Sequence, residues 1–63
     1  MNQNEKNAMI DARLKQYEQQ IFALEIDRTA LMAIEDTEGI KGIDQRIESL
    51  RKAYKAVEAM KEE

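Results

Sequence analysis

The sequence predicts an all-α protein, an antiparallel two-helix hairpin with a long first helix and a shorter second helix. Three observations support this fold class. The 63 residues include no proline and only two glycines, so little interrupts a helix. Apolar residues recur at steps of three and four in two separate runs, which is the spacing of one helix face. One short segment with turn-forming residues separates the two runs. We therefore expect a single domain over residues 1–63.

The first helix is predicted over about residues 3–36. Asn2 can cap its first turn, and Glu5, three residues later, completes the pattern of a capping box. Its main apolar stripe has heptad spacing and consists of Ile10, Leu14, Tyr17, Ile21, Leu24 and Leu31. Arg28 occupies the one position of this stripe where an apolar residue is expected.

The turn is predicted at residues 37–42, because Gly39 can adopt the left-handed conformation that ends a helix. The second helix then runs over about residues 43–61. Its apolar stripe is unbroken and consists of Ile40, Ile43, Ile47, Leu50, Tyr54 and Val57. Helices joined by a short connection pack as antiparallel neighbours, so the two stripes should face each other. With this turn, the second helix reaches back only to about Tyr17.

Two features of the first helix predict a homo-oligomer, in the simplest case a dimer that forms a four-helix bundle or a related coiled-coil assembly. First, Met9, Ile10 and Leu14 would extend beyond the second helix. Second, another apolar group lies about 100–180° around the helix from Ile21, at about 100° per residue. The predicted interface with another copy or a partner is therefore Met9, Ile10, Leu14, Phe22, Ile26, Ala30 and Ala33. Scattered surface apolar residues are the alternative, but this group is contiguous.

Arg28 lies on the inner stripe, where we expect it opposite Leu50. A buried guanidinium without a partner is very unfavourable, so it should pair with Glu25, with Glu35 or with an acidic residue of a partner chain. Two interpretations remain open at this point. Arg28 is either a polar core residue that specifies helix register or oligomeric state, or a residue at the edge of the interface with its charge in water.

The composition argues against an enzyme and against a bound cofactor. Histidine and cysteine are both absent, and the single serine, Ser49, has no neighbouring base. A two-helix hairpin also offers no deep pocket for a substrate. The acidic residues near the turn are Glu35, Asp36, Glu38 and Asp44. They do not form a calcium loop, because Lys41 and Ile47 occupy the positions that require glycine and glutamate. No metal site is predicted.

These observations favour a small protein-interaction module in the cytoplasm, such as an adaptor, an assembly factor or an inhibitor of a larger partner. The net charge of −3 provides no general attraction to nucleic acids or anionic membranes, and no apolar run is long enough to span a bilayer. An RNA- or DNA-binding hairpin is the alternative, and its candidate contacts are Arg46, Arg51, Lys52 and Lys55. Against it, Glu48 is placed to pair with Lys52, and no aromatic residue is placed to stack on bases.

Overall fold

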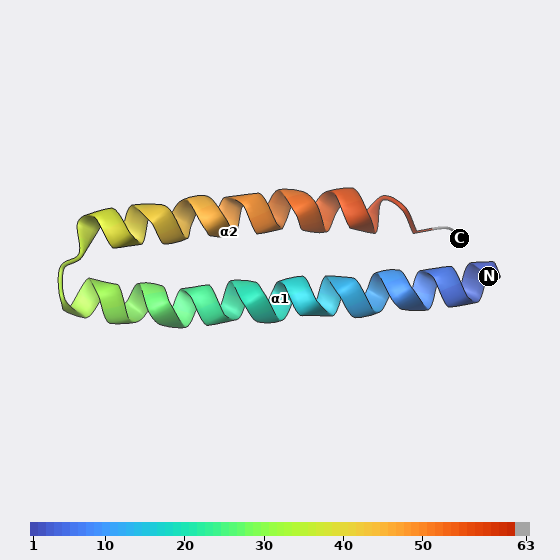
Figure 1. The fold of residues 1–63 in the computed structure, drawn as a ribbon, viewed down its shortest axis with the longest axis horizontal. Helices are drawn as coiled ribbons and strands as arrows, with labels where there is room; N and C mark the ends of the chain where they lie inside the picture. The colour runs from blue at the N-terminus through green and yellow to red at the C-terminus, as the bar shows by residue number, and fades with distance from the viewer. Residues whose placement is uncertain (62–63) are drawn as a thin grey trace.

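Residues 1–61, which the computed structural model describes, form two helices, α1 (Gln3–Ala33) and α2 (Thr37–Glu58). Figure 1 shows the helices side by side in opposite directions, with the start of α1 and the end of α2 at the same end of the hairpin. The molecule measures 49 × 15 × 14 Å, which is the size of a single pair of helices with no further layer packed on it. These features confirm the predicted all-helical hairpin.

The start of α1 follows the predicted cap. The Asn2 side chain accepts a hydrogen bond from the backbone N–H of Glu5, with an Oδ1–N distance of 2.8 Å. This contact satisfies one of the backbone donors that the first helical turn leaves without a partner.

The connection between the helices lies at residues 34–36, earlier than the predicted turn at residues 37–42. Glu35 adopts the left-handed conformation, with φ of 58°. Its N–H donates to the Met32 carbonyl at 3.2 Å, and the N–H of Asp36 donates to the Leu31 carbonyl at 3.0 Å. This pair of hydrogen bonds is the Schellman motif, in which glycine is the usual left-handed residue. Here glutamate takes that position, which is why the sequence pattern did not indicate it.

Gly39 lies in the first turn of α2, so its predicted left-handed role is wrong. Asp36 is the N-cap of α2, and its side chain accepts a hydrogen bond from the Gly39 N–H at 2.9 Å. A Cβ on Gly39 would lie 2.8 Å from Asp36 Cγ and 2.9 Å from Leu31 Cδ1. Glycine is needed here because the capping carboxylate and α1 both approach the backbone closely.

The earlier turn changes which residues of the two helices face each other. Because the chain reverses about four residues sooner than predicted, α2 reaches further back along α1. The predicted overhang is therefore wrong for Leu14, which is 7% exposed, and for Ile10, which is half-buried. Met9 alone of the three remains exposed, at 62%.

The core is a single row of side chains between the helices. Leu14, Ile47 and Leu50 are its buried members, each 7% exposed, and no side chain in residues 1–61 is completely buried. The other stripe residues are half-buried, namely Ile10, Tyr17, Ile21, Leu24, Leu31, Ile40, Ile43, Tyr54 and Val57. Most of the apolar core surface thus keeps some contact with solvent.

Candidate interaction surface

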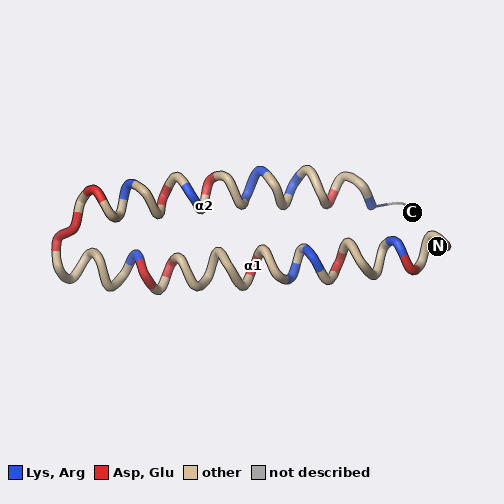
Figure 2. The backbone as a smooth tube through the Cα atoms, in the orientation of Figure 1, with Lys and Arg blue, Asp and Glu red and all other residues tan. Residues whose placement is uncertain are grey.

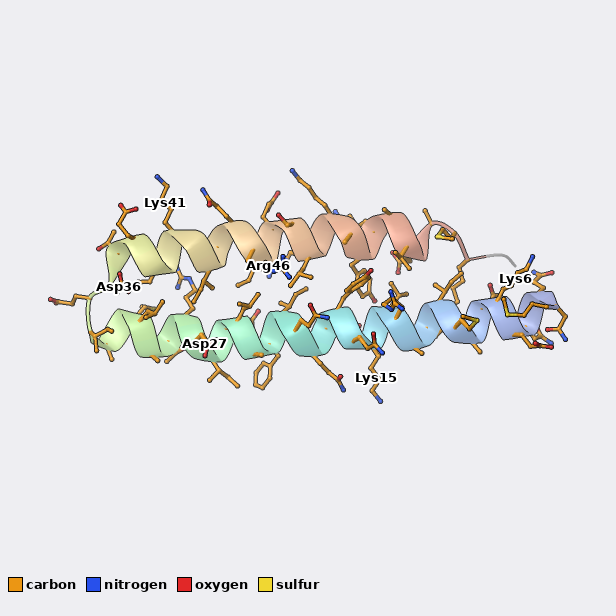
Figure 3. All side chains as sticks on the ribbon, viewed as in Figure 1. Lys6, Lys15, Asp27, Asp36, Lys41 and Arg46 are labelled. Atoms are coloured by element: carbon orange, nitrogen blue, oxygen red, sulfur yellow. The ribbon has the colours of Figure 1, made fainter. Side chains whose placement is uncertain are left out.

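The side of α1 that faces away from α2 carries two large exposed apolar side chains. Phe22 is 63% exposed and Ile26 is 56% exposed. We call this side the outer face of α1, and define it as Ala12, Lys15, Gln19, Phe22, Ile26, Thr29, Ala30 and Ala33, all of which are exposed. Lys15 marks the face in Figure 3, where its side chain projects away from α2.

The outer face exists because α1 carries apolar residues on two opposite sides. The inner stripe packs on α2, and at about 100° per residue Phe22 and Ile26 are directed away from it. A single α2 helix cannot reach both sides. By contrast, α2 has one apolar side, which it buries against α1.

The total accessible surface shows how incomplete the core is. It amounts to 4984 Å², whereas a folded monomer of 7.3 kDa exposes about 4,200 Å² on average. The excess of about 800 Å² reflects the elongated shape of the hairpin and a core in which most side chains are only half-buried.

The residues of the predicted interface fall into three places. Phe22, Ile26, Ala30 and Ala33 lie together on the outer face. Ile10 and Leu14 belong to the core of the hairpin. Met9 lies at the open end, where Met1, Lys6, Met9, Ile10 and Met60 line a shallow apolar groove. Three flexible methionine side chains make this groove adaptable in shape.

Arg28 lies at the edge of the helix–helix interface and pairs with Asp44 of α2. Its Nε donates to Asp44 Oδ1 at 2.8 Å, and its Nη2 donates to Oδ2 at 3.4 Å. The side chains are 39% and 49% exposed, so the charges remain in contact with water. The hydrogen bond from Arg28 holds the pKa of the Asp44 carboxyl below its ordinary value.

Both expectations for the surroundings of Arg28 were wrong. Its partner is Asp44, not Glu25 or Glu35, and it faces the start of α2, not Leu50. The cause is again the earlier turn, which moves each α1 residue opposite an earlier part of α2. A half-exposed ion pair at the interface edge agrees with the second of the two interpretations of Arg28.

Further polar contacts join the two helices. Glu18 Oε1 accepts a hydrogen bond from the Tyr54 hydroxyl at 3.1 Å, which raises the pKa of Tyr54. Asp11 Oδ1 lies 2.7 Å from Lys61 Nζ, and their hydrogen bond raises the pKa of Lys61. Because these side chains are exposed, each pair adds little stability by itself, but together they favour one alignment of the helices.

The four basic residues considered for nucleic-acid binding do not form one patch. Arg51, Lys52 and Lys55 line a groove that also contains Glu18 and Glu48. Lys52 Nζ lies 3.8 Å from Glu48 Oε1. Arg51 Nη2 lies 4.0 Å from Oε1 of Glu25, on α1. Arg46 lines a different groove, with Gln20, Ala23, Leu24 and Leu50.

Charge is distributed unevenly along the hairpin, as Figure 2 shows. Residues 25–44, which form the turn and the helix ends beside it, contain six acidic and two basic side chains. Residues 45–63 contain five basic and four acidic side chains, and residues 1–24 contain three of each kind. The negative charge of the chain is therefore concentrated at the turn, and the rest of the sequence is close to neutral.

Within residues 1–61, no group of three or more acidic side chains is arranged to hold a metal ion. Neither α1 nor α2 has an apolar stretch long enough to cross a membrane.

Comparison with protein-family models, with curated proteins and with solved structures gives no match. The outer face of α1 is therefore the feature on which we base a function.

Proposed function

We propose that this chain is a non-enzymatic helical protein-interaction module that works as a homo-oligomer, in its simplest form a dimer. The exposure of Phe22 and Ile26 on the outer face of α1 carries this proposal. Complete burial of such a side chain is worth about 1.5–3 kcal/mol. At 63% and 56% exposure, each still has about 1–2 kcal/mol to gain from a partner.

Self-association would also bury more apolar surface, of which the single hairpin buries little. Its core holds three buried side chains, and a chain of this length usually needs disulfides, a metal or oligomerisation to be stable. The sequence contains neither cysteine nor histidine. Pairing of two outer faces would form a four-helix assembly with α1 of each chain at its centre and α2 outside.

An assembly of this kind retains surfaces for another protein. The groove at the open end, lined by Met1, Met9 and Met60, lies away from the outer face of α1 and would remain accessible. We propose that the dimer uses such a surface to act as an adaptor, an assembly factor or an inhibitor of a larger partner in the cytoplasm. Cell fractionation would test the location.

Ile26→Lys tests the proposal. The new charge would be placed in the proposed interface and should convert the dimer into a monomer in a light-scattering measurement of molar mass. Gln45→Lys is the matched control, since it adds the same charge at an exposed position of α2. Equal molar masses for wild type and both variants would contradict the proposal.

An RNA- or DNA-binding hairpin is the second candidate, because Arg51, Lys52 and Lys55 line one groove. Binding of this kind would be detectable at low salt and would fall steeply as salt is added. We favour protein interaction because glutamates Glu18 and Glu48 share that groove. A fluorescence-anisotropy titration with a mixed-sequence RNA and a mixed-sequence DNA separates the two candidates.

A further inference from the structure

We propose that the occupant of the outer face is a second copy of the chain in antiparallel orientation, with Phe22 of each subunit packed on Ile26 of the partner subunit. This inference rests on the proposed self-association and specifies its geometry. Three observations lead to it: the spacing of the outer-face residues, the uneven charge of the hairpin and the position of Lys15.

Six of the outer-face residues lie in pairs at equal distances on either side of residue 24. Phe22 and Ile26 lie two positions on either side of that point, and Gln19 and Thr29 lie five positions on either side. In a two-fold symmetric antiparallel pair, residues at equal distances from the centre meet in one layer. Phe22 then packs on Ile26 of the partner subunit, and the polar Gln19 meets Thr29 of the partner subunit. The two apolar layers thus lie at the centre, with polar layers outside them.

Charge selects the antiparallel orientation. Residues 25–44 carry an excess of acidic side chains, so parallel hairpins would bring two negative turns together (Figure 2). Antiparallel hairpins bring each negative turn beside the N-terminal half of the other α1. This half carries Lys15 on the outer face, directed away from α2 (Figure 3). The N-terminal half is neutral overall, with three acidic and three basic side chains in residues 1–24. The antiparallel arrangement therefore avoids the repulsion between two negative turns that disfavours the parallel one.

Lys15 has a specific acidic neighbour in this arrangement. It would lie opposite Ala33 of the partner subunit, two residues before the partner's Glu35 in the connection that follows α1. Side chains on a helix tilt toward its N-terminus, which in an antiparallel pair is the direction of the partner's turn. Glu35 is exposed and has no ion pair in the described part of the hairpin, so its carboxylate can accept the Lys15 ammonium.

The size of the face fits this occupant. From Ala12 to Ala33 the outer face extends for about 32 Å at 1.5 Å per residue. Centred on residue 24, the α1 helix of an antiparallel copy lies opposite residues 15–33, which is about 27 Å of this length.

Single-cysteine variants test the orientation, because the natural chain contains no cysteine. We would prepare Gln19→Cys and Thr29→Cys, measure the molar mass of each reduced variant, and then oxidise each variant alone and the two together. In the proposed dimer, the two substituted positions meet only between unlike subunits. Identical positions are about 15 Å apart along the helix axis, whereas a disulfide requires Cα atoms within about 7 Å.

A disulfide-linked dimer that forms only in the mixture would support the proposal. Linked dimers from each variant alone would indicate parallel helices and overturn it. A dimeric mass without any linkage would also overturn it, but would leave the proposed self-association intact. A monomeric wild-type chain would refute the proposed self-association, and the orientation with it.

Charge reversal gives an independent test that needs no new covalent bond. Lys15→Glu and Glu35→Lys should each weaken the dimer by roughly 2- to 30-fold, because each removes two exposed ion pairs per dimer. The variant that combines both changes should recover most of the lost affinity, since opposite charges again face each other. Additive losses in the double variant, measured by sedimentation equilibrium, would contradict the proposed contact.

Discussion

Replacement of Phe22 by alanine should weaken the dimer strongly while leaving the isolated hairpin nearly unchanged. Phe22 is 63% exposed, so little of its surface is buried within the chain. Burial of that exposed part in a dimer is worth about 1–2 kcal/mol per side chain. A symmetric dimer contains two copies, and the loss of about 2–4 kcal/mol corresponds to a dissociation constant roughly 30- to 900-fold higher.

Sedimentation equilibrium at several concentrations would measure this dissociation constant, and circular dichroism would measure the helix content of each variant. Met60→Ala is the control, because Met60 is similarly exposed, at 65%, but lies at the open end. Its dissociation constant should match that of the wild type. A Phe22→Ala variant that remains helical and dimerises as tightly as the wild type would refute the role of the outer face.

Five further predictions concern the hairpin itself. Gly42→Ala should raise the free energy of unfolding by about 0.5–1 kcal/mol, since a Cβ there meets no atom within 4 Å. Gly39→Ala should lower the free energy of unfolding by about 1 kcal/mol, because the new Cβ would displace the capping aspartate. Urea unfolding would measure both changes. Glu35→Gly, introduced into the Ile26→Lys variant that we expect to be monomeric, should raise the free energy of unfolding by about 1 kcal/mol. The reason is that glycine adopts the left-handed conformation without strain. Arg28→Leu should raise the Tm by completing the apolar stripe, whereas a large fall would show that the ion pair is essential. In an NMR pH titration the pKa of the Asp44 carboxyl should lie below the ordinary aspartate value of about 3.9 in the wild type. In Arg28→Leu the pKa should be closer to that ordinary value.

The lowered pKa of Asp44 also determines how the stability of the hairpin depends on pH. The folded state favours the charged carboxylate, so the ion pair with Arg28 stabilises the fold at pH values above the ordinary pKa. This contribution is lost as the pH falls through the lower pKa of the folded state. The acid limb of a stability-against-pH curve should therefore be shallower in Arg28→Leu than in the wild type.

The fold class and the outer face could be predicted because both depend only on helical periodicity. The steps of three and four residues place the inner stripe on one side of α1 and Phe22 and Ile26 on the other, wherever the turn lies. The exposure of these two side chains agrees with that prediction.

The alignment of the two helices could not be predicted, because it depends on the position of the turn. Gly39 was the stronger turn signal, yet the left-handed residue is Glu35, at some cost in conformational energy. This one difference explains the burial of Leu14 and the pairing of Arg28 with Asp44. The run of Asp36 followed by a glycine three residues later is the signal that would have indicated an N-cap.

The molar mass of the wild-type chain in solution, measured by light scattering over a range of concentrations, tests the central claim most directly. We predict a mass of twice the 7.3 kDa of one chain at high concentration, with dissociation on dilution. A folded chain that keeps the mass of one copy at every concentration would contradict the account.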